Sequence, residues 1–329
     1  MRRRRFLASA LVAASGLPLL GCGQAVSRAA AQPVGLPSDQ RLAIDSVEGK
    51  IAFVKNGDIW RWSSGKTHQV TRGNHYEGPA WSPDGTRLAA SFMGENHSEI
   101  VIITEAGARV RQLTRNFSTA SIKHQAWGRK PAWSPDGRRV AFVSDQGPLV
   151  NGVKTLDMSL FVVGTDGSNL SRLMVQKPGT GGLDWPTWSA DGIRIAYTAF
   201  DSEPSQIQVY NLSTGEWRNL TAHPEGAYDP AWSPDGKWIA YVVRERGRHD
   251  VYVMRADGTE PVRVTDTGVN RAPAWSPDGQ LLAYLANTGG CFDLFVVRLG
   301  FAEGIMVSEP RQLTRGEGVE ATSGLSWAS

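Results

Sequence analysis

Three features of the sequence predict an all-β fold made of repeated sheets. A motif occurs five times, as Pro-Ala-Trp-Ser-Pro-Asp-Gly at 79–85, 131–137, 230–236 and 273–279 and as Pro-Thr-Trp-Ser-Ala-Asp-Gly at 186–192. Successive motif tryptophans lie 43 to 55 residues apart, a period typical of sheets arranged around an axis. The composition of 36 Gly, 18 Pro and 12 Trp in 329 residues favours short strands and turns over long helices.

Each copy of the motif begins a four-stranded unit. The tryptophan ends a short apolar strand, and Ser-Pro-Asp-Gly then forms a tight turn, because Pro fixes φ, Asp binds nearby N–H groups and Gly accepts the left-handed conformation. A second strand follows, for example 239–242, and then a third such as 250–254. The fourth strand ends in Arg-x-Leu-Thr or a variant, as at 111–114, 218–221 and 311–314. Four antiparallel strands of this kind make one blade of a β-propeller.

The two ends of the repeat region complement each other. Residues 49–71 supply second, third and fourth strands without a first strand, and residues 324–329 supply a first strand with no successor. Together they complete one blade, so we expect a six-bladed β-propeller over residues 49–329, closed by pairing of the N- and C-terminal strands. Closure removes free strand edges that would otherwise promote aggregation.

The N-terminus has the features of an export signal. Four arginines at 2–5 precede an uncharged stretch from Phe6 to Leu20, which is shorter than the roughly 20 residues of a membrane-spanning helix. Leu19-Leu20-Gly21-Cys22 resembles the lipobox of bacterial lipoproteins, and Arg-Arg-Arg-Phe-Leu at 3–7 resembles the twin-arginine motif. We therefore expect a signal peptide at 1–21, a lipid on Cys22 and a flexible tether over 22–48. The alternative is a chance cysteine near an ordinary cleavage site, and both the Sec and the twin-arginine routes remain open.

Removal of the signal changes the charge of the chain. The formal net charge falls from +3 to −1, because residues 1–21 contain four arginines and no acid. Nucleic-acid binding therefore loses its electrostatic basis. If Cys22 carries a lipid, the second cysteine, Cys291, has no partner for an intramolecular disulfide. We expect a protein anchored by lipid to the cell envelope, in the periplasm or on the outer face of the cytoplasmic membrane, with the choice between inner and outer membrane left open.

The five Trp-Ser-[Pro/Ala]-Asp-Gly copies resemble the WD-like repeats of the TolB β-propeller family, over about residues 49–329. The resemblance implies a periplasmic protein whose propeller mouth binds a lipoprotein, as TolB binds Pal. TolB proteins carry an α/β domain before the propeller, whereas residues 23–48 of this sequence are a short stretch rich in Ala, Gln, Gly and Pro.

Candidate binding residues lie where the repeats differ, since the repeated residues serve turns and packing between blades. The inter-blade loops and the second-to-third-strand loops share one face, which we call the mouth. The longest of each kind, 115–130 and 145–157, belong to the third blade, which predicts a binding surface near Phe117, Lys123, His124, Trp127, Arg129 and Lys154. Residues just before each first strand should surround the central opening: Tyr76, Glu77, Arg129, Lys130, Asp184, Trp185, Tyr228, Asp229, Asn270, Arg271 and Ser323.

These features favour a binding scaffold without catalytic activity. We expect a monomer without cofactor or metal that docks an envelope protein or a cell-wall glycan and contacts the membrane through its lipid only. No G-x-S-x-G, P-loop or dinucleotide motif occurs. The alternative is a metal-assisted glycan lyase or hydrolase that uses mouth-loop histidines: His75, His97, His124, His223 and His249. Against it, the sequence has no H-x-H or HExxH spacing.

Overall fold

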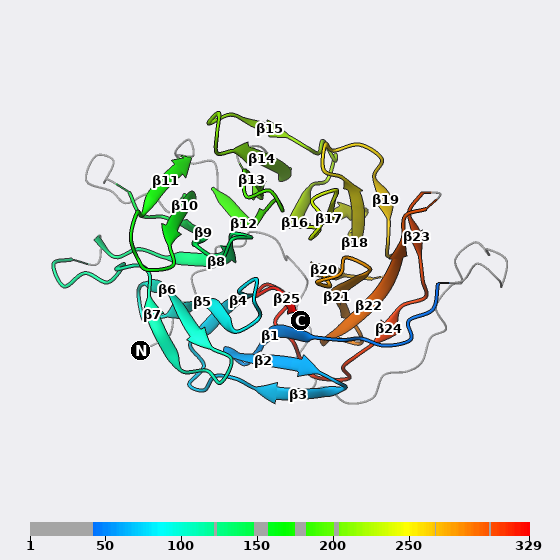
Figure 1. The fold of residues 1–329 in the computed structure, drawn as a ribbon, viewed down its shortest axis with the longest axis horizontal. Coiled ribbons are helices and arrows are strands. Elements are labelled where there is room, and N and C mark those ends of the chain that lie inside the picture. The colour runs from blue at the N-terminus through cyan, green and yellow to red at the C-terminus, as the bar shows by residue number, and fades with distance from the viewer. Residues whose placement is uncertain are drawn as a thin grey trace.

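A computed structural model describes residues 42–121, 124–147, 157–174, 182–200, 204–266, 268–302 and 304–329. These residues form six antiparallel sheets arranged in a ring (Figure 1). The predicted all-β, six-bladed β-propeller is therefore confirmed. The innermost strand of each blade is the one that ends in the motif tryptophan, and the fourth strand lies outermost.

The blades follow one another in chain order around the ring. Blade 1 contains β25 (Ser326–Ala328), β1 (Lys50–Lys55), β2 (Asp58–Ser63) and β3 (Lys66–Gln69). Blade 2 contains β4 (Tyr76–Trp81), β5 (Arg87–Met93), β6 (Ser98–Thr104) and β7 (Arg109–Gln112). Blade 3 contains β8 (Gly128–Trp133), β9 (Arg139–Ser144), β10 (Ser159–Gly164) and β11 (Ser171–Met174).

The remaining blades complete the ring. Blade 4 contains β12 (Leu183–Trp188), β13 (Arg194–Ala199), β14 (Gln206–Asn211) and β15 (Trp217–Asn219). Blade 5 contains β16 (Ala227–Trp232), β17 (Trp238–Glu245), β18 (Arg248–Arg255) and β19 (Val262–Arg263). Blade 6 contains β20 (Asn270–Trp275), β21 (Leu281–Asn287), β22 (Phe292–Gly300), β23 (Met306–Val307) and β24 (Arg311–Gln312).

The two ends of the chain close the ring as expected. Strand β25 pairs antiparallel with β1, with Ile51 opposite Trp327. Blade 6 differs from the other blades, because two short strands share its outer edge. Strand β24 pairs with the middle of β22, as the Arg-x-Leu-Thr pattern predicts, and β23 pairs with the end of β22 at Leu299 and Gly300.

The motif tryptophans join neighbouring blades. The indole Nε1 of Trp133 donates to the carbonyl oxygen of Ala80 in the preceding blade at 3.0 Å. The same bond joins Trp188 to Ala132 at 3.1 Å and Trp275 to Ala231 at 3.0 Å. Where the preceding blade has a hydroxyl residue in place of alanine, that hydroxyl accepts from the backbone N–H of the tryptophan instead: Thr187 from Trp232 and Ser326 from Trp81. These contacts explain why the residues around the motif repeat.

Where the fourth strand ends in Arg-x-Leu-Thr or in a variant that keeps the threonine, this threonine also has a structural role. The threonine hydroxyl accepts the N–H of a third-strand residue and donates to a buried side chain at the start of that strand: Asp58, Glu99, Gln206, Asp250 or Asp293. The arginine can reach the next blade, as when Arg111 Nη1 donates to the carbonyl oxygen of Asp166 at 2.7 Å. The pattern therefore fixes the outer strands within and between blades.

Residues 42–48 contact the propeller. Ile44 and Val47 pack against the core shared by blades 6 and 1, and the carbonyl oxygen of Glu48 accepts from Trp327 Nε1 at 2.9 Å. Part of the segment that the sequence assigns to the tether therefore lies on the outer edge of the ring, beside β24 (Figure 1). Among the described residues, no helix is long and apolar enough to cross a membrane. The predicted signal peptide and Cys22 lie outside the described residues.

Candidate functional site

The innermost strands share an unusual backbone feature that shapes the central channel. In each of β4, β8, β12, β16 and β20 the pairing register shifts after the first residues. One residue at the shift has a positive φ, and the same holds just before β25: Gly78, Lys130, Trp185, Asp229, Ala272 and Gly324. We call these six residues the channel ring. Because the backbone is alike in all six, the blades differ here only in the side chains that they place in the channel.

A cavity of about 440 Å³ occupies the channel. It is lined by the channel ring and by the Trp-Ser-Pro turns that follow the innermost strands. It therefore extends from the channel ring toward the turn face, which is the face opposite the mouth.

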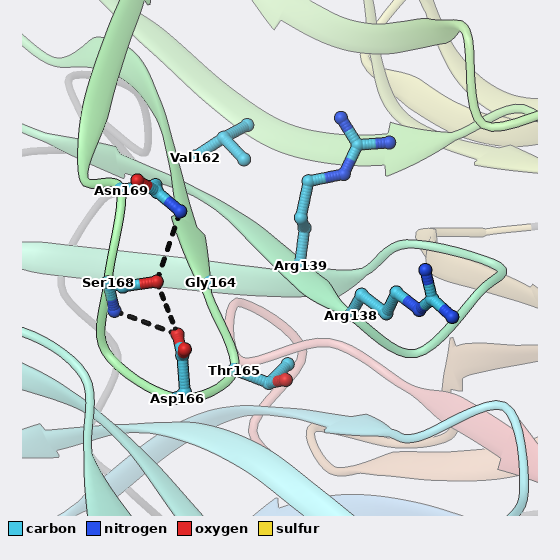
Figure 2. Close-up of a pocket in the computed structure, with 8 residues that line it drawn as sticks. All are labelled: Arg138, Arg139, Val162, Gly164, Thr165, Asp166, Ser168 and Asn169. Carbon is cyan, nitrogen blue, oxygen red and sulfur yellow. Dashed lines mark hydrogen bonds between the residues drawn. The ribbon is translucent and has the colours of Figure 1, made fainter.

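A second cavity, of about 390 Å³, lies on the turn face of blade 3 (Figure 2). Arg138 and Arg139 come from one turn, and Asp166, Ser168 and Asn169 from the next. The Asp166 carboxylate accepts from the hydroxyl and the backbone N–H of Ser168 at 2.6 and 2.9 Å. The Asp166 carboxylate is therefore already hydrogen-bonded within its own turn. The cavity lies on the turn face, whereas the predicted site lies on the mouth.

On the mouth side of the channel ring, Glu77 and Arg129 join blades 2 and 3. Arg129 Nη2 donates to Glu77 Oε2 at 2.6 Å, and each side chain is 29% exposed. Burial alone would raise the pKa of Glu77, but the cations of Arg129 and Lys130 outweigh burial and hold that pKa below its usual value. Both residues were predicted at the mouth, and the structure places them in direct contact.

A more buried ion pair joins blades 5 and 6. Arg271 donates twice to the Asp229 carboxylate, at 2.8 and 3.2 Å, and the Asp229 side chain is 1% exposed. The N–H of Ala272 donates to the same carboxylate at 3.2 Å.

The guanidinium carbon of Arg271 also lies 4.7 Å from the centroid of the Tyr228 ring, and the Tyr228 hydroxyl hydrogen-bonds His249 Nδ1. Burial and the cations of Arg271 and Arg244 lower the pKa of His249, so the imidazole is neutral near pH 7.

Lys130 and Trp185 close the channel at the level of the channel ring. The Lys130 side chain is buried, its Nζ donates to the carbonyl oxygen of Thr322, and Nζ lies 3.9 Å from the centroid of the Trp185 ring. The Trp185 ring crosses from blade 4 to Gly324 in the opposite blade, where a Cβ would meet ring carbons at 2.5 and 2.7 Å. Burial lowers the pKa of Lys130 to about 8. We call Lys130, Trp185 and Gly324 the channel plug.

Asp184 lies beside the channel plug and is partly exposed. Within the described ranges, its one hydrogen bond comes from the backbone N–H of Trp185 at 2.9 Å. Burial raises the pKa of Asp184, and the nearby cations of Lys130 and Arg129 oppose that rise in part. Unlike Asp229, this carboxylate receives no side-chain donor from the described residues.

An aromatic surface lies farther out on the mouth, at the junction of blades 2 and 3. Phe117 is 56% exposed, and its ring centroid lies 5.1 Å from that of His97. The backbone N–H of Phe117 donates to the buried Glu99 carboxylate at 3.1 Å, and the N–H of Trp127 donates to Asp145 at 2.7 Å. The loops that carry Phe117 and Trp127 are therefore tied to the blades. We call His97, Phe117 and Trp127 the aromatic patch.

Blade 3 has the longest connections, as the sequence predicts. The connection from β7 to β8 is the longest between blades, and that from β9 to β10 is the longest between second and third strands. Of the residues expected there, His124 is exposed and Trp127 is partly exposed. Lys123 and Lys154 lie outside the described residues.

Several other expected site residues have structural positions. Tyr76 is buried in the core of blades 1 and 2. Ser323 is buried, and its hydroxyl accepts from the N–H of Gly78 at 3.0 Å. The residues expected just before the first strands are instead, Ser323 excepted, part of those strands, because each strand continues past the register shift.

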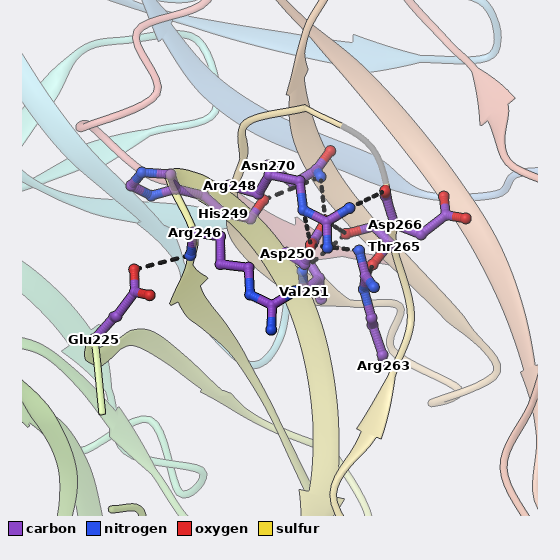
Figure 3. A network of polar contacts seen from close by, with 10 residues as sticks. All are labelled: Glu225, Arg246, Arg248, His249, Asp250, Val251, Arg263, Thr265, Asp266 and Asn270. Atoms are coloured by element: carbon purple, nitrogen blue, oxygen red, sulfur yellow. Dashed lines mark hydrogen bonds and ion pairs between the residues drawn. The ribbon is translucent and has the colours of Figure 1, made fainter. Parts of the chain in front are cut away.

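Asn270 belongs to a polar network at the mouth edge of blade 5 (Figure 3). It is buried, and its Nδ2 donates to the carbonyl oxygen of His249 at 3.1 Å. Arg263 and Arg248 lie 2.7 and 3.9 Å from Asp250, so the acid is neutralised within the blade.

Cys291 is not a free thiol in the structure, but disulfide-bonded. The other cysteine of the sequence is Cys22, which lies outside the described residues. The expectation that Cys291 has no disulfide is therefore not met, and a lipid on Cys22 and a disulfide with Cys22 exclude each other.

The mouth histidines contact different neighbouring residues and do not come together. His75 lies against Phe92, His97 against Phe117, and His223 Nε2 lies 3.2 Å from the Tyr241 hydroxyl. In the described part of the chain, no group of three or more His, Cys, Asp or Glu side chains is placed to hold a metal ion. The arrangement of these histidines does not match the donor convergence that a metal site requires.

Part of the propeller sequence matches a known family of propeller repeats. Residues 149–308 match the family model described as PD40, TolB beta propeller domain. The uncharacterized peptidase YuxL of Bacillus subtilis strain 168 is 28% identical over 219 residues, which are 54% of this chain and 31% of that protein. The uncharacterized protein Atu1656 of Agrobacterium fabrum is 26% identical over 215 residues, or 55% and 70% of the two chains. A TolB homolog of Chlorobaculum tepidum is 29% identical over 132 residues, or 40% and 28%.

Solved structures agree on the fold. TolB from Acinetobacter baumannii superposes with a TM-score of 0.64 at 20% identity, covering 85% of this chain and 66% of that one. A chain of the nidogen/laminin complex superposes with a TM-score of 0.61 at 13% identity, covering 85% and 98%. This chain therefore spans less than a third of YuxL and of the Chlorobaculum homolog and about two thirds of the Acinetobacter TolB. In its matched repeats and in its six-bladed ring, the domain is similar to TolB-type β-propellers.

Proposed function

We propose that this protein is a lipid-anchored, extracytoplasmic binding scaffold that docks an envelope protein on the mouth of its propeller. The aromatic patch carries this proposal. Among the described residues, Phe117 is the most exposed large apolar side chain, and it lies on the mouth, where blade 3 adds its long loops. Exposed aromatic side chains on a fixed backbone are typical of residues that dominate protein interfaces.

The closed channel supports docking on a surface over insertion into a tunnel. The plug residues Lys130 and Trp185 fill the channel, and the pairs Glu77–Arg129 and Asp229–Arg271 surround it. Because these side chains already satisfy one another, a large ligand would have to break several buried contacts to pass. A partner that rests on the mouth and contacts the aromatic patch leaves the Glu77–Arg129 and Asp229–Arg271 pairs intact.

The names of the relatives are consistent with a binding role. TolB-type propellers recur among the matched proteins and structures. YuxL is named a peptidase, but the match covers 31% of that protein. The mouth histidines of this chain engage separate neighbours, so we propose no metal-assisted reaction.

Capture of partners tests the docking proposal. The mature chain, with an affinity tag in place of residues 1–22, is incubated with envelope extract, and the proteins retained are identified by mass spectrometry. We expect Phe117→Ser and Trp127→Ala to reduce capture of a specific protein at least tenfold. Trp217→Ala is the matched control, because Trp217 is 49% exposed at the start of β15, next to the turn face. Equal capture by all variants, or retention of peptidoglycan fragments without protein, would contradict the proposal.

The lipid anchor needs a separate experiment, because Cys22 can either carry a lipid or form a disulfide with Cys291. Mass spectrometry of the protein purified from membranes distinguishes a diacylglycerol on Cys22 from a disulfide with Cys291. We expect the lipid adduct on Cys22, and we expect Cys22→Ser to release the protein into the soluble fraction. A disulfide-linked peptide pair, or a Cys22→Ser protein that stays in the membrane, would refute the anchor.

A further inference from the structure

The charged residues around the channel plug are not all paired with one another. Arg129 neutralises Glu77, and Arg271 neutralises Asp229. The two charges left, Lys130 and Asp184, form no ion pair with each other or with another described residue. Lys130 donates to the carbonyl oxygen of Thr322, and Asp184 accepts only a backbone N–H.

Asp184 therefore retains capacity to accept hydrogen bonds. An ionised carboxylate has about four acceptor positions, and one of them is used in the described structure. A buried or partly buried carboxylate without a donor is unfavourable, so a ligand that brings a donor gains from the contact. The same reasoning excludes Asp229, whose oxygens already accept from Arg271 and from the N–H of Ala272.

Trp185 follows Asp184 in the chain and presents an aromatic face. The Lys130 ammonium lies over this face at 3.9 Å, which shows that the position accepts a cation. A cation over the face of an indole is attracted by the ring quadrupole, by about 0.5–2 kcal/mol depending on desolvation. An aromatic face and an unpaired carboxylate on adjacent residues form a pair of contacts that suits a guanidinium or ammonium group.

We propose that Asp184 and Trp185 receive a basic side chain, arginine or lysine, of the protein that docks on the mouth, and that Lys130 competes with this side chain for the Trp185 ring. This inference rests on the proposed docking function and adds the chemistry of the partner. Arginine suits the site best, because its planar group can pair with a carboxylate and stack on an indole at once.

A pair of small probes tests the proposal on the mature chain. Acetyl-arginine amide carries the charge, and acetyl-citrulline amide has nearly the same shape without it; their binding is compared by saturation-transfer NMR. We expect the wild type to prefer the arginine probe, and we expect Asp184→Asn to lose at least about fivefold in affinity for it. Lys130→Met should gain at least about fivefold, since it removes the competing cation and leaves Asp184 less neutralised.

Controls separate this site from general charge effects. Glu216→Gln removes an exposed acid from the turn-face side of the same blade and should bind the arginine probe like the wild type. Circular dichroism checks that each variant is folded, and Lys130→Met tests the proposal even where Asp184→Asn does not fold. Equal binding of both probes by Lys130→Met, or unchanged affinity in a folded Asp184→Asn, would overturn the inference.

The outcomes also separate this inference from the docking proposal. If a partner is captured through Phe117 while Asp184→Asn changes neither capture nor probe binding, the docking proposal stands and the basic-side-chain site fails. If the arginine probe binds at Asp184 but capture is the same for all variants, the site stands and the docking proposal fails.

Discussion

The ammonium of Lys130 lies 3.9 Å from the centroid of the Trp185 ring, and the two residues come from neighbouring blades at the same position of the repeat. Both have φ near +52°, as the register shift in the innermost strands requires. This conformation is unfavourable for residues other than glycine, yet it directs both side chains into the channel. Their contact, with Thr322 and Gly324 across the ring, makes the propeller a closed platform.

Burial of Lys130 should make the stability of the protein depend on pH in alkaline solution. The folded pKa is about 8, below the ordinary value of 10.5, so between these values the unfolded chain binds more protons than the folded chain. Stability should therefore rise with pH from about 8 to 10.5, by on the order of 3 kcal/mol. Guanidinium unfolding at pH 7 to 10 measures this, with Lys130→Met as the reference. A difference between the two proteins that stays constant with pH would contradict the burial of a charged lysine.

Gly324→Ala should destabilise the protein through Trp185. The new Cβ would lie 2.5 Å from a carbon of the Trp185 ring, so the ring must move, at a cost of about 1–3 kcal/mol beyond backbone strain. Gly316→Ala is the matched control, because Gly316 also has a positive φ, of 67°, but a Cβ added there would meet no atom within 4 Å beyond its chain neighbours. In a double-mutant cycle, Trp185→Ala should remove the excess cost of Gly324→Ala. Equal losses for the two glycine variants would show that the ring does not press on Gly324.

The two ion pairs of the mouth should differ in their contribution to stability. Arg271→Met leaves the Asp229 carboxylate, 1% exposed, without its partner, and we expect a loss of about 3–5 kcal/mol. Arg129→Met leaves Glu77, which is 29% exposed and can be hydrated, so we expect a loss of about 1 kcal/mol. Urea unfolding of both variants measures the difference. A similar small loss in both would mean that Asp229 is hydrated in solution.

The indole bonds between blades can be tested with a matched pair of tryptophan variants. Trp133→Phe removes the donor to the carbonyl oxygen of Ala80 as well as ring volume. Trp81→Phe removes similar volume but no such bond, because Trp81 Nε1 has no acceptor among the described residues. We expect Trp133→Phe to cost about 1 kcal/mol more in free energy of unfolding than Trp81→Phe. If the two losses are equal, the indole bonds contribute nothing to the joining of blades.

The fold could be predicted from the sequence because its determinants are local and repeated. Trp, Ser-Pro-Asp-Gly and the alternating strands lie within one repeat each, and the unmatched ends indicated how the ring closes. The structure confirms this closure in the pairing of Ile51 with Trp327.

The contacts around the channel were not predictable in the same way. The sequence placed Arg129, Asp184, Trp185 and Arg271 near the opening, but their partners depend on the register shift and on residues from other blades. Lys130 reaches Thr322, 192 positions away, and Trp185 reaches Gly324. No periodic pattern contains these pairings. The buried acids that receive the Arg-x-Leu-Thr hydroxyls, such as Asp293, were also missed, although each occurs at the start of a third strand.

Site-specific photo-crosslinking on the exported protein tests the central claim, docking on the mouth, most directly. A photoreactive phenylalanine analogue replaces Phe117 in one strain and Trp217, next to the turn face, in another. We expect a discrete crosslinked protein from position 117 that is absent from position 217. A crosslink from position 217 with none from position 117, or none from either, would contradict docking on the mouth.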